Sequence, residues 1–146
     1  MTVIKQEDLI QSVADALQYI SYYHPKDFID AVHAAYEREE SKAAKDAMAQ
    51  ILINSRMCAM GHRPICQDTG IVTVFLTIGM DVKFEGDMSV EDMCNEGVRR
   101  AYTHPDNVLR ASVLADPDGK RANTKDNTPA IIHMKLVPGN TVDVHV

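Results

Sequence analysis

The stretch RPICQDTGIVTVFLTIG, Arg63 to Gly79, decides the predicted fold class because the sequence pattern changes within it. Apolar residues recur at helical spacing before this stretch, whereas Ile71 to Ile78 is uncharged and rich in β-branched and aromatic residues. That composition is typical of a strand, and we expect one that is covered on both faces. The pentapeptide CQDTG, Cys66 to Gly70, stands directly before the strand. Few sequences place such reactive side chains there unless something binds.

Three helices are predicted in the residues that precede this stretch. Each has an apolar stripe at the spacing of an amphipathic helix. Pro25 suits the first turn of the second helix, the third begins at about Ser41, and Gly61 is expected just past its end. The three stripes are Leu9, Ile10, Val13, Leu17 and Ile20; Phe28, Ile29, Val32 and Tyr36; and Ala44, Ala47, Met48, Ile51, Leu52 and Ser55.

Shorter elements are predicted after the first strand. In chain order we expect a turn or hairpin at Gly79–Asp87, a short helix opened by a capping box of Ser89 and Asp92, a long loop at Thr103–Asn127 that contains a short strand at Val108–Leu114, and strands at Pro129–Val137 and Thr141–Val146. The two last strands are separated by the turn residues Pro138, Gly139 and Asn140.

These elements together predict an α+β fold. An N-terminal helical layer, residues 1–61, is expected to pack on a small sheet within residues 62–146. The length of 146 residues suits a single domain. Because the chain ends within the alternating strand pattern TVDVHV, we expect it to be part of a larger catalytic domain.

Composition and charge argue against several functions. A formal net charge of -6 argues against nonspecific nucleic-acid binding, which needs a basic surface. No apolar run approaches the ~20 residues that span a bilayer. The N-terminus lacks the features of a secretory signal, so the three cysteines are expected to be reduced thiols in the cytoplasm. Their spacing fits no zinc ribbon or ferredoxin run, so at most one or two contribute to a site completed elsewhere.

The pentapeptide CQDTG offers the functional groups of a small anion site. A Cys66 thiolate can bind iron, Gln67 offers a donor and an acceptor, and Asp68 offers a charge. Gly70 lets a ligand approach the backbone. The same residues also suit a turn before a strand, and their spacing alone leaves both interpretations open.

Two further segments carry polar residues of interest. The run RANTKDNTPA, Arg121 to Ala130, contains two Asn-Thr pairs and favours a hydrogen-bonded loop over the lining of an active-site mouth. Arg110, in NVLRAS, either extends to solvent or binds a carboxylate, and its neighbours alone favour the surface position.

A cysteine nucleophile is the competing enzymatic hypothesis. Cys66 would need a base, and His62 is close in sequence. No third residue or oxyanion site is evident, so this hypothesis ranks below a metal site. Cys58 and Cys94 lie within predicted helices and are expected to be buried packing residues.

Three motifs in the same order resemble one known family. PICQDTG, LRAS and NTKDNTPA resemble the N-terminal half of the class I, iron–sulfur fumarate hydratases, to which the alpha subunit of L-tartrate dehydratase is closely related. The resemblance extends from the helical N-terminus to the last residue, and PICQDTG is its most specific part. Lys125 departs from the pattern, because relatives often carry glycine at this position.

The resemblance implies a hydro-lyase that interconverts fumarate and L-malate with a 4Fe–4S cluster. Three cysteines hold the cluster in that family, and the one that falls in this chain is Cys66. Gln67 and Asp68 match residues that hydrogen-bond the dicarboxylate, and Arg110 matches an arginine that contacts a substrate carboxylate. The general acid and base are not identified in this chain.

The same resemblance implies partners and leaves alternatives. The expected partners are a small dicarboxylate substrate, the remainder of the catalytic chain or a partner subunit, and a second copy in a homodimer. The chain alone is expected to be inactive, because it lacks two cluster ligands. Alternative functions are dehydration of L-tartrate or another hydroxy-diacid, and a non-catalytic folding or interaction module.

Overall fold

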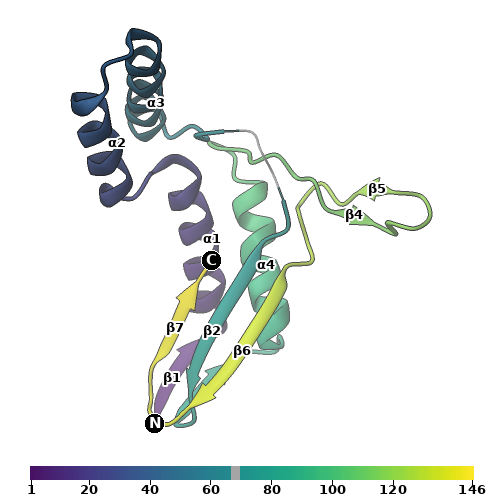
Figure 1. Cartoon of the computed structure of the whole chain (residues 1–146). Helices are drawn as coiled ribbons and strands as arrows, with labels where there is room; N and C mark the ends of the chain where they lie inside the picture. The colour runs from purple at the N-terminus through teal and green to yellow at the C-terminus, as the bar shows by residue number, and fades with distance from the viewer. Residues whose placement is uncertain (67–69) are drawn as a thin grey trace. The chain divides into compact units, whose positions relative to one another are not determined.

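The computed structural model describes residues 1–66 and 70–146 and has the mixed α+β architecture that the sequence predicts (Figure 1). The chain forms two compact units. We call Met1–Gln18 together with Gln67–Val146 the sheet unit, and Tyr19–Cys66 the helical unit. Helix α1, Gln6–Tyr22, contributes to both, because its last turn belongs to the helical unit.

A three-stranded sheet with the order β6-β2-β7 lies at the centre of the sheet unit. The middle strand β2 (Thr73–Gly79) pairs in parallel with β6 (Ile131–Val137) and antiparallel with β7 (Val142–His145). The strands predicted near the C-terminus therefore exist, and they lie on either side of β2 instead of pairing with each other.

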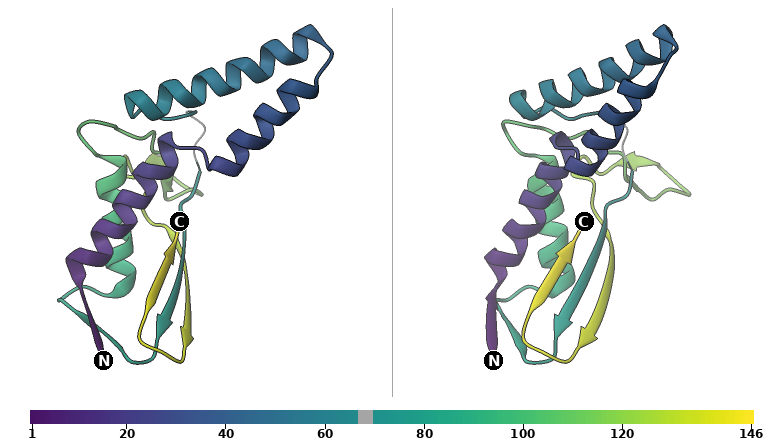
Figure 2. Two further views of the ribbon diagram at one scale, coloured as in Figure 1. Left: turned by 90° about the vertical axis from the view of Figure 1, so that its left-hand side faces the viewer. Right: turned by 60° about the vertical axis from the view of Figure 1, so that its left-hand side comes forward.

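One face of this sheet packs against α1 and against α4 (Val90–Tyr102), which form a second layer in Figure 2. Successive side chains of β2 alternate between the two faces, so every second residue points toward the helices. The buried core consists of Leu9, Ile10, Val13, Ala14 and Leu17 from α1, Val72, Val74, Leu76 and Ile78 from β2 and the residue before it, and Met93, Cys94, Val98 and Ala101 from α4.

The opposite face of β2 is exposed in this chain. Phe75 lies on it with 52% of its surface exposed, and its ring stacks on His133 of β6 at a centroid distance of 5.0 Å. The prediction of a strand covered on both faces is therefore wrong for the chain as described. Thr73 and Thr77 lie on the same face as Phe75. The strand therefore alternates between buried and more exposed residues, as half-buried strands do, although its sequence carries no charge.

The sequence predicts a turn or a hairpin at Gly79–Asp87. The structure has a turn there, and the strand that follows does not pair with β2. Strand β3 (Val82–Glu85) pairs in parallel with β1 (Thr2–Lys5), a strand that the sequence did not indicate. The turn between β2 and β3 instead contacts the turn between β6 and β7, since the Asp81 amide donates to the Gly139 carbonyl at 2.9 Å. A Cβ on Gly79 would collide with the Gly139 backbone, so glycine is required there.

Helix α4 begins with one half of the predicted capping box, the bond from the Asp92 amide to the Ser89 side chain. The Ser89 hydroxyl accepts a hydrogen bond from the Asp92 amide at 3.0 Å and donates one to the Asp92 carboxylate at 2.7 Å. This satisfies one of the amides that the first turn leaves unpaired.

The loop after α4 is longer than predicted. Its first strand is β4 (Leu114–Ala115), which pairs with β5 (Ala122–Asn123), so most of the strand predicted at Val108–Leu114 is absent.

The helical unit contains the last turn of α1 with α2 (Lys26–Arg38) and α3 (Lys42–Gly61), which run side by side in opposite directions in Figure 2. Helix α3 begins close to its predicted start at about Ser41, whose side chain caps the helix by accepting from the Ala44 amide. The end of α3 lies one residue later than predicted, because His62 takes the left-handed cap position at φ 47°. None of the helices in the described ranges has the length and apolarity needed to cross a bilayer.

Candidate active site

A buried asparagine joins three separate motifs within the sheet unit. The Asn127 side chain is 0% exposed. Its Oδ1 accepts hydrogen bonds from the amides of Ser112 and Val113 at 2.7 and 3.1 Å, and its Nδ2 donates to the Gly70 carbonyl at 2.9 Å. The end of PICQDTG, the segment that follows LRA, and NTKDNTPA therefore meet at one side chain.

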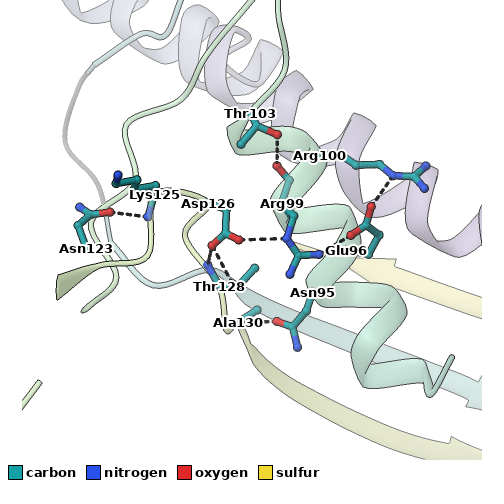
Figure 3. Close-up of polar contacts among 10 residues, drawn as sticks. All are labelled: Asn95, Glu96, Arg99, Arg100, Thr103, Asn123, Lys125, Asp126, Thr128 and Ala130. Atoms are coloured by element: carbon teal, nitrogen blue, oxygen red, sulfur yellow. Dashed lines mark hydrogen bonds and ion pairs between the residues drawn. The ribbon is translucent and has the colours of Figure 1, made fainter. Parts of the chain in front are cut away.

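Asn123, the other asparagine of the polar run, is exposed and binds the backbone of the same segment. Asn123 Nδ2 donates to the Ala111 carbonyl at 2.8 Å. Its Oδ1 accepts from the Lys125 amide at 2.7 Å, the bond drawn in Figure 3. The Thr124 amide adds a bond to the Val113 carbonyl at 2.9 Å. We call Asn123 and Asn127, with the Ala111–Val113 segment and Gly70, the asparagine clamp. The asparagines of both Asn-Thr pairs belong to it, which confirms the hydrogen-bonded loop favoured by the sequence.

Asp126 ties this loop to helix α4. Its carboxylate accepts from Arg99 Nε at 3.0 Å and from the Thr128 amide and hydroxyl at 3.1 and 2.8 Å (Figure 3). Burial acts to raise the pKa of Asp126, but the hydrogen bonds from Thr128 and Arg99 outweigh it and hold the pKa below its ordinary value. A second tie is the bond from the Ala130 amide to Asn95 Oδ1 at 2.8 Å.

The two arginines of α4 are engaged in ion pairs that support the fold. Arg99 and Arg100 both bind Glu96, and Arg100 also binds Glu7 of α1 through two nitrogens. The hydrogen bonds from Arg100 lower the pKa values of Glu7 and Glu96. These guanidinium groups are thus committed to the protein's own carboxylates, which makes them poor candidates for binding a substrate.

One departure from the family pattern falls at a left-handed position of the backbone. Lys125 and Asn127 both adopt left-handed conformations, at φ 68° and 62°. Asparagine tolerates this region well, whereas lysine does so at a cost of about 1–2 kcal/mol. Glycine, which the resemblance predicts at position 125, would adopt it without strain.

The three cysteines differ in their surroundings. Cys58 and Cys94 are 6% and 0% exposed, whereas Cys66 is exposed. Burial, with a smaller contribution from Glu91, raises the pKa of Cys94 to about 11. The Cys58 thiol donates to the Pro64 carbonyl at 3.5 Å, a bond that requires its proton. The prediction that Cys58 and Cys94 are buried packing residues is confirmed.

The residue before Cys66 is held on both sides within the helical unit. The Ile65 amide donates to the Ser21 carbonyl at 2.8 Å, and Asn54 Nδ2 donates to the Ile65 carbonyl at 3.1 Å. Cys66 therefore follows a fixed backbone segment, although its own side chain is open to solvent.

His62 is occupied by aromatic neighbours. Its ring stacks on Tyr22 with a centroid distance of 4.7 Å, and its Nε2 lies 3.4 Å from the Tyr23 hydroxyl. The contacts described for His62 thus give no support to its proposed role as a base for Cys66.

The structure describes some of the remaining predicted site residues and not others. Gln67 and Asp68 lie outside the described residues. Arg110 has an exposed side chain and directly precedes the clamped segment. A Cβ on Gly70 would meet no atom within 4 Å, so packing against the described residues does not require glycine there.

The described residues suit one ligand of a metal cluster and not a complete site. No group of three His, Cys, Asp or Glu side chains gathers as a metal site within residues 1–66 and 70–146. One exposed sulfur, that of Cys66, has the chemistry and the access that an iron ligand needs, whereas the thiols of Cys58 and Cys94 are buried.

Comparison with known proteins assigns the family. The family described as fumarate hydratase (Fumerase) matches residues 10–146, which include all three motifs. The chain belongs to this fumarate hydratase family. The "Fumarate hydratase class I, anaerobic" of Escherichia coli is 31% identical over 130 residues, which cover 89% of this chain and 23% of that protein.

A second relative carries another substrate in its name. A Methanocaldococcus jannaschii protein, provisionally named L(+)-tartrate dehydratase subunit alpha, is 32% identical over 89 residues. The matched region covers 61% of this fumarate hydratase family chain and 31% of that protein. The chain thus spans about a quarter to a third of the length of these two relatives.

Asn127 and Asp126 are the site residues that sequence reasoning did not single out. The repeated Asn-Thr pair was a usable signal, because two short side chains that both donate and accept can fasten two neighbouring backbone segments. The backbone partners of these two asparagines were not predictable from local pattern, because Ala111 lies 12 residues before Asn123 and Gly70 lies 57 residues before Asn127.

Proposed function

We propose that this chain is the N-terminal part of a 4Fe–4S-dependent hydro-lyase that interconverts fumarate and L-malate. The match of the fumarate hydratase family to residues 10–146 is the observation that carries this proposal. The chain would supply one side of the active site, and the remainder of the catalytic chain or a partner subunit would supply the other. Residues 1–146 as a whole would form the N-terminal part of that catalytic domain.

Cys66 is the proposed cluster ligand. Its exposed sulfur and the fixed backbone of Ile65 support this role, since a ligand must be accessible and held in place. When bound, the cluster would supply a Lewis-acidic iron to the oxygens of the substrate. The two further ligands would come from outside this chain, because Cys58 and Cys94 are buried.

Gln67, Asp68 and Arg110 are the proposed substrate-binding residues. The Arg110 guanidinium offers a planar pair of donors that matches a carboxylate group. The asparagine clamp supports this role, because it immobilises the backbone that directly follows Arg110. Gln67 would donate or accept one hydrogen bond, and Asp68 would hold a hydroxyl or water proton near the dicarboxylate.

The proposed setting is cytoplasmic, and the proposed assembly is a homodimer. Reduced cysteines support the first point, since all three of the chain's cysteines are free thiols. The isolated 146-residue chain would be catalytically silent, because a cluster held by one thiolate would not persist.

Side-by-side rates in the intact protein test the proposed activity. The protein would be prepared without oxygen, and hydration of fumarate would be compared with dehydration of L-tartrate. We expect the fumarate rate to dominate, and the isolated chain to produce no malate. Robust malate formation by the isolated chain would refute the shared active site.

The tartrate reaction is the second candidate, favoured by the name of the Methanocaldococcus jannaschii relative. A dominant tartrate rate would select it while leaving the hydro-lyase chemistry in place. An intact protein that held no iron and bound no dicarboxylate would instead favour the third alternative, a non-catalytic interaction module.

A further inference from the structure

The residue before Cys66 is bonded to two helices of the helical unit. The Ile65 amide donates to the carbonyl of Ser21, in the last turn of α1, at 2.8 Å. The side chain of Asn54, in α3, donates through Nδ2 to the Ile65 carbonyl at 3.1 Å. Both hydrogen-bonding groups of the Ile65 backbone are thus engaged, and all four residues belong to the same compact unit.

The bond from Asn54 orients the peptide group that carries Cys66. The Ile65 carbonyl and the Cys66 nitrogen belong to one planar group, which also contains the Cys66 Cα atom. Once that plane is held, the sulfur can move relative to it only by rotation about φ and χ1 of Cys66. A donor on the Ile65 carbonyl therefore limits where the sulfur can lie.

A second contact fixes the orientation of the Asn54 amide. Its Oδ1 lies 3.7 Å from the sulfur of Cys58, and that thiol also lies 3.5 Å from the Pro64 carbonyl. The amide oxygen thus faces a donor, whereas the amide nitrogen faces the Ile65 carbonyl, an acceptor. Only one of the two orientations of an asparagine amide satisfies both neighbours.

Asn54 is an unusual choice for its place in the helix. It lies within α3, where asparagine is one of the weaker helix formers, and it is exposed, so it fills no space in the core. A residue that goes against local preference without a gain in packing is typical of a functional site. The bond to Ile65 is the gain that the structure shows for it.

We propose that Asn54 is a positioning residue that holds the Cys66 sulfur ready to bind iron. This inference rests on the proposed function, which makes Cys66 a ligand of the cluster. A thiolate that is already held near its bound position loses less conformational freedom when the metal binds. Groups that orient metal ligands in this way typically contribute about tenfold to a hundredfold to metal affinity.

The rate of cluster loss from the intact protein tests the inference. Protein loaded without oxygen would be mixed with an excess of a ferrous iron chelator, and the decay of the visible absorption of the cluster would be timed. Asn54→Ala is expected to speed this decay about tenfold, because it removes the donor to Ile65. Alanine is also the stronger helix former, so the urea midpoint of the cluster-free protein should not fall.

A second variant and a matched control accompany this change. Asn54→Asp keeps the size of the side chain and an oxygen toward Cys58, but its other oxygen repels the Ile65 carbonyl, so the same acceleration is expected. Gln50→Ala removes an exposed amide one turn earlier on α3 and leaves the bond to Ile65 in place. It should keep the rate of cluster loss within about twofold of the original.

Three results would overturn the inference. The first is an unchanged rate of cluster loss in both Asn54 variants, and the second is an equal acceleration in Gln50→Ala. The third is a fall in the urea midpoint of both Asn54 variants, or their failure to fold, which would assign Asn54 to folding instead. If the unaltered intact protein took up no iron, the proposed function would fail, and the inference with it.

Discussion

Alkylation of the native 146-residue chain should distinguish its three thiols by rate. Treatment with iodoacetamide at about pH 8 is expected to modify Cys66 quickly and to leave Cys58 and Cys94 unmodified, because the thiolate must be both formed and accessible. The change in mass after a short exposure should therefore correspond to one label per chain.

The expected difference in rate follows from ionisation and burial. With its pKa raised to about 11, Cys94 is about 0.1% ionised at pH 8, whereas a thiol with an ordinary pKa of about 8.5 is about a quarter ionised. Ionisation alone thus slows Cys94 about 200-fold relative to such a thiol. Its 0% exposure adds the cost of an opening reaction, which ranges up to the full free energy of unfolding.

Mass spectrometry of timed samples measures these rates, and peptide mapping assigns each label. A parallel reaction in concentrated urea should add three labels, which controls for reagent and for oxidised thiols. Two or three labels at similar rates in the native chain would refute the reasoning, because Cys66 would no longer be distinguished from the other two thiols. Fast labelling at Cys94 would further contradict its place in the core.

Three stability predictions follow from the packing and the polar loop. Gly97→Leu is expected to lower the free energy of unfolding by about 1–3 kcal/mol in urea titrations, because a Cβ there would lie 2.7 Å from the Ile10 carbonyl oxygen; an unchanged midpoint would contradict the packing of α1 on α4. Lys125→Gly is expected to raise that free energy by about 0.5 kcal/mol, since relief of about 1–2 kcal/mol of left-handed strain exceeds about 0.4–1 kcal/mol of added unfolded-chain entropy; a loss of stability would count against the φ of 68°. Asp126→Asn should destabilise the chain above pH 3.8, the ordinary pKa of the carboxyl, because the folded state lowers that pKa. The difference in free energy of unfolding between the variant and the original chain should shrink as the pH falls below 3.8. A constant difference from about pH 7 to about pH 3 would exclude the ion pair with Arg99 as its cause.

Local patterns predicted the helices and their capping, because those features depend on residues close in sequence. The stripe of α1 from Leu9 to Leu17, the start of α3 near Ser41, the capping serine before α4 and the switch to strands after Gly70 appear as expected. Ile20, the last member of the predicted stripe, is instead 50% exposed. The parallel pairing of β1 with β3 was not predictable in this way, since the partners Thr2 and Val82 are 80 residues apart and β1 has only four residues. The exposed face of β2 was misjudged because an uncharged strand was taken to be fully covered.

The candidate site was likewise predictable where it depends on residues close in sequence, and not where it depends on distant partners. The motif order indicated which residues to examine, and helical spacing placed Cys58 and Cys94 in packed positions. The buried role of Asn127 depends on Gly70, 57 residues earlier, and on Ser112, so only the fold reveals it. Lys125 shows the converse, because a departure from the family pattern acquired a physical meaning once its backbone angle was known.

The iron content of the intact protein, prepared without oxygen, tests the central claim most directly. Cys66→Ser should abolish bound iron and the visible absorption of the cluster, because it removes a ligand. Cys58→Ser is the control and should retain both, since a serine hydroxyl can donate to the Pro64 carbonyl as the thiol does. Full iron in Cys66→Ser, with loss confined to Cys58→Ser, would contradict the account.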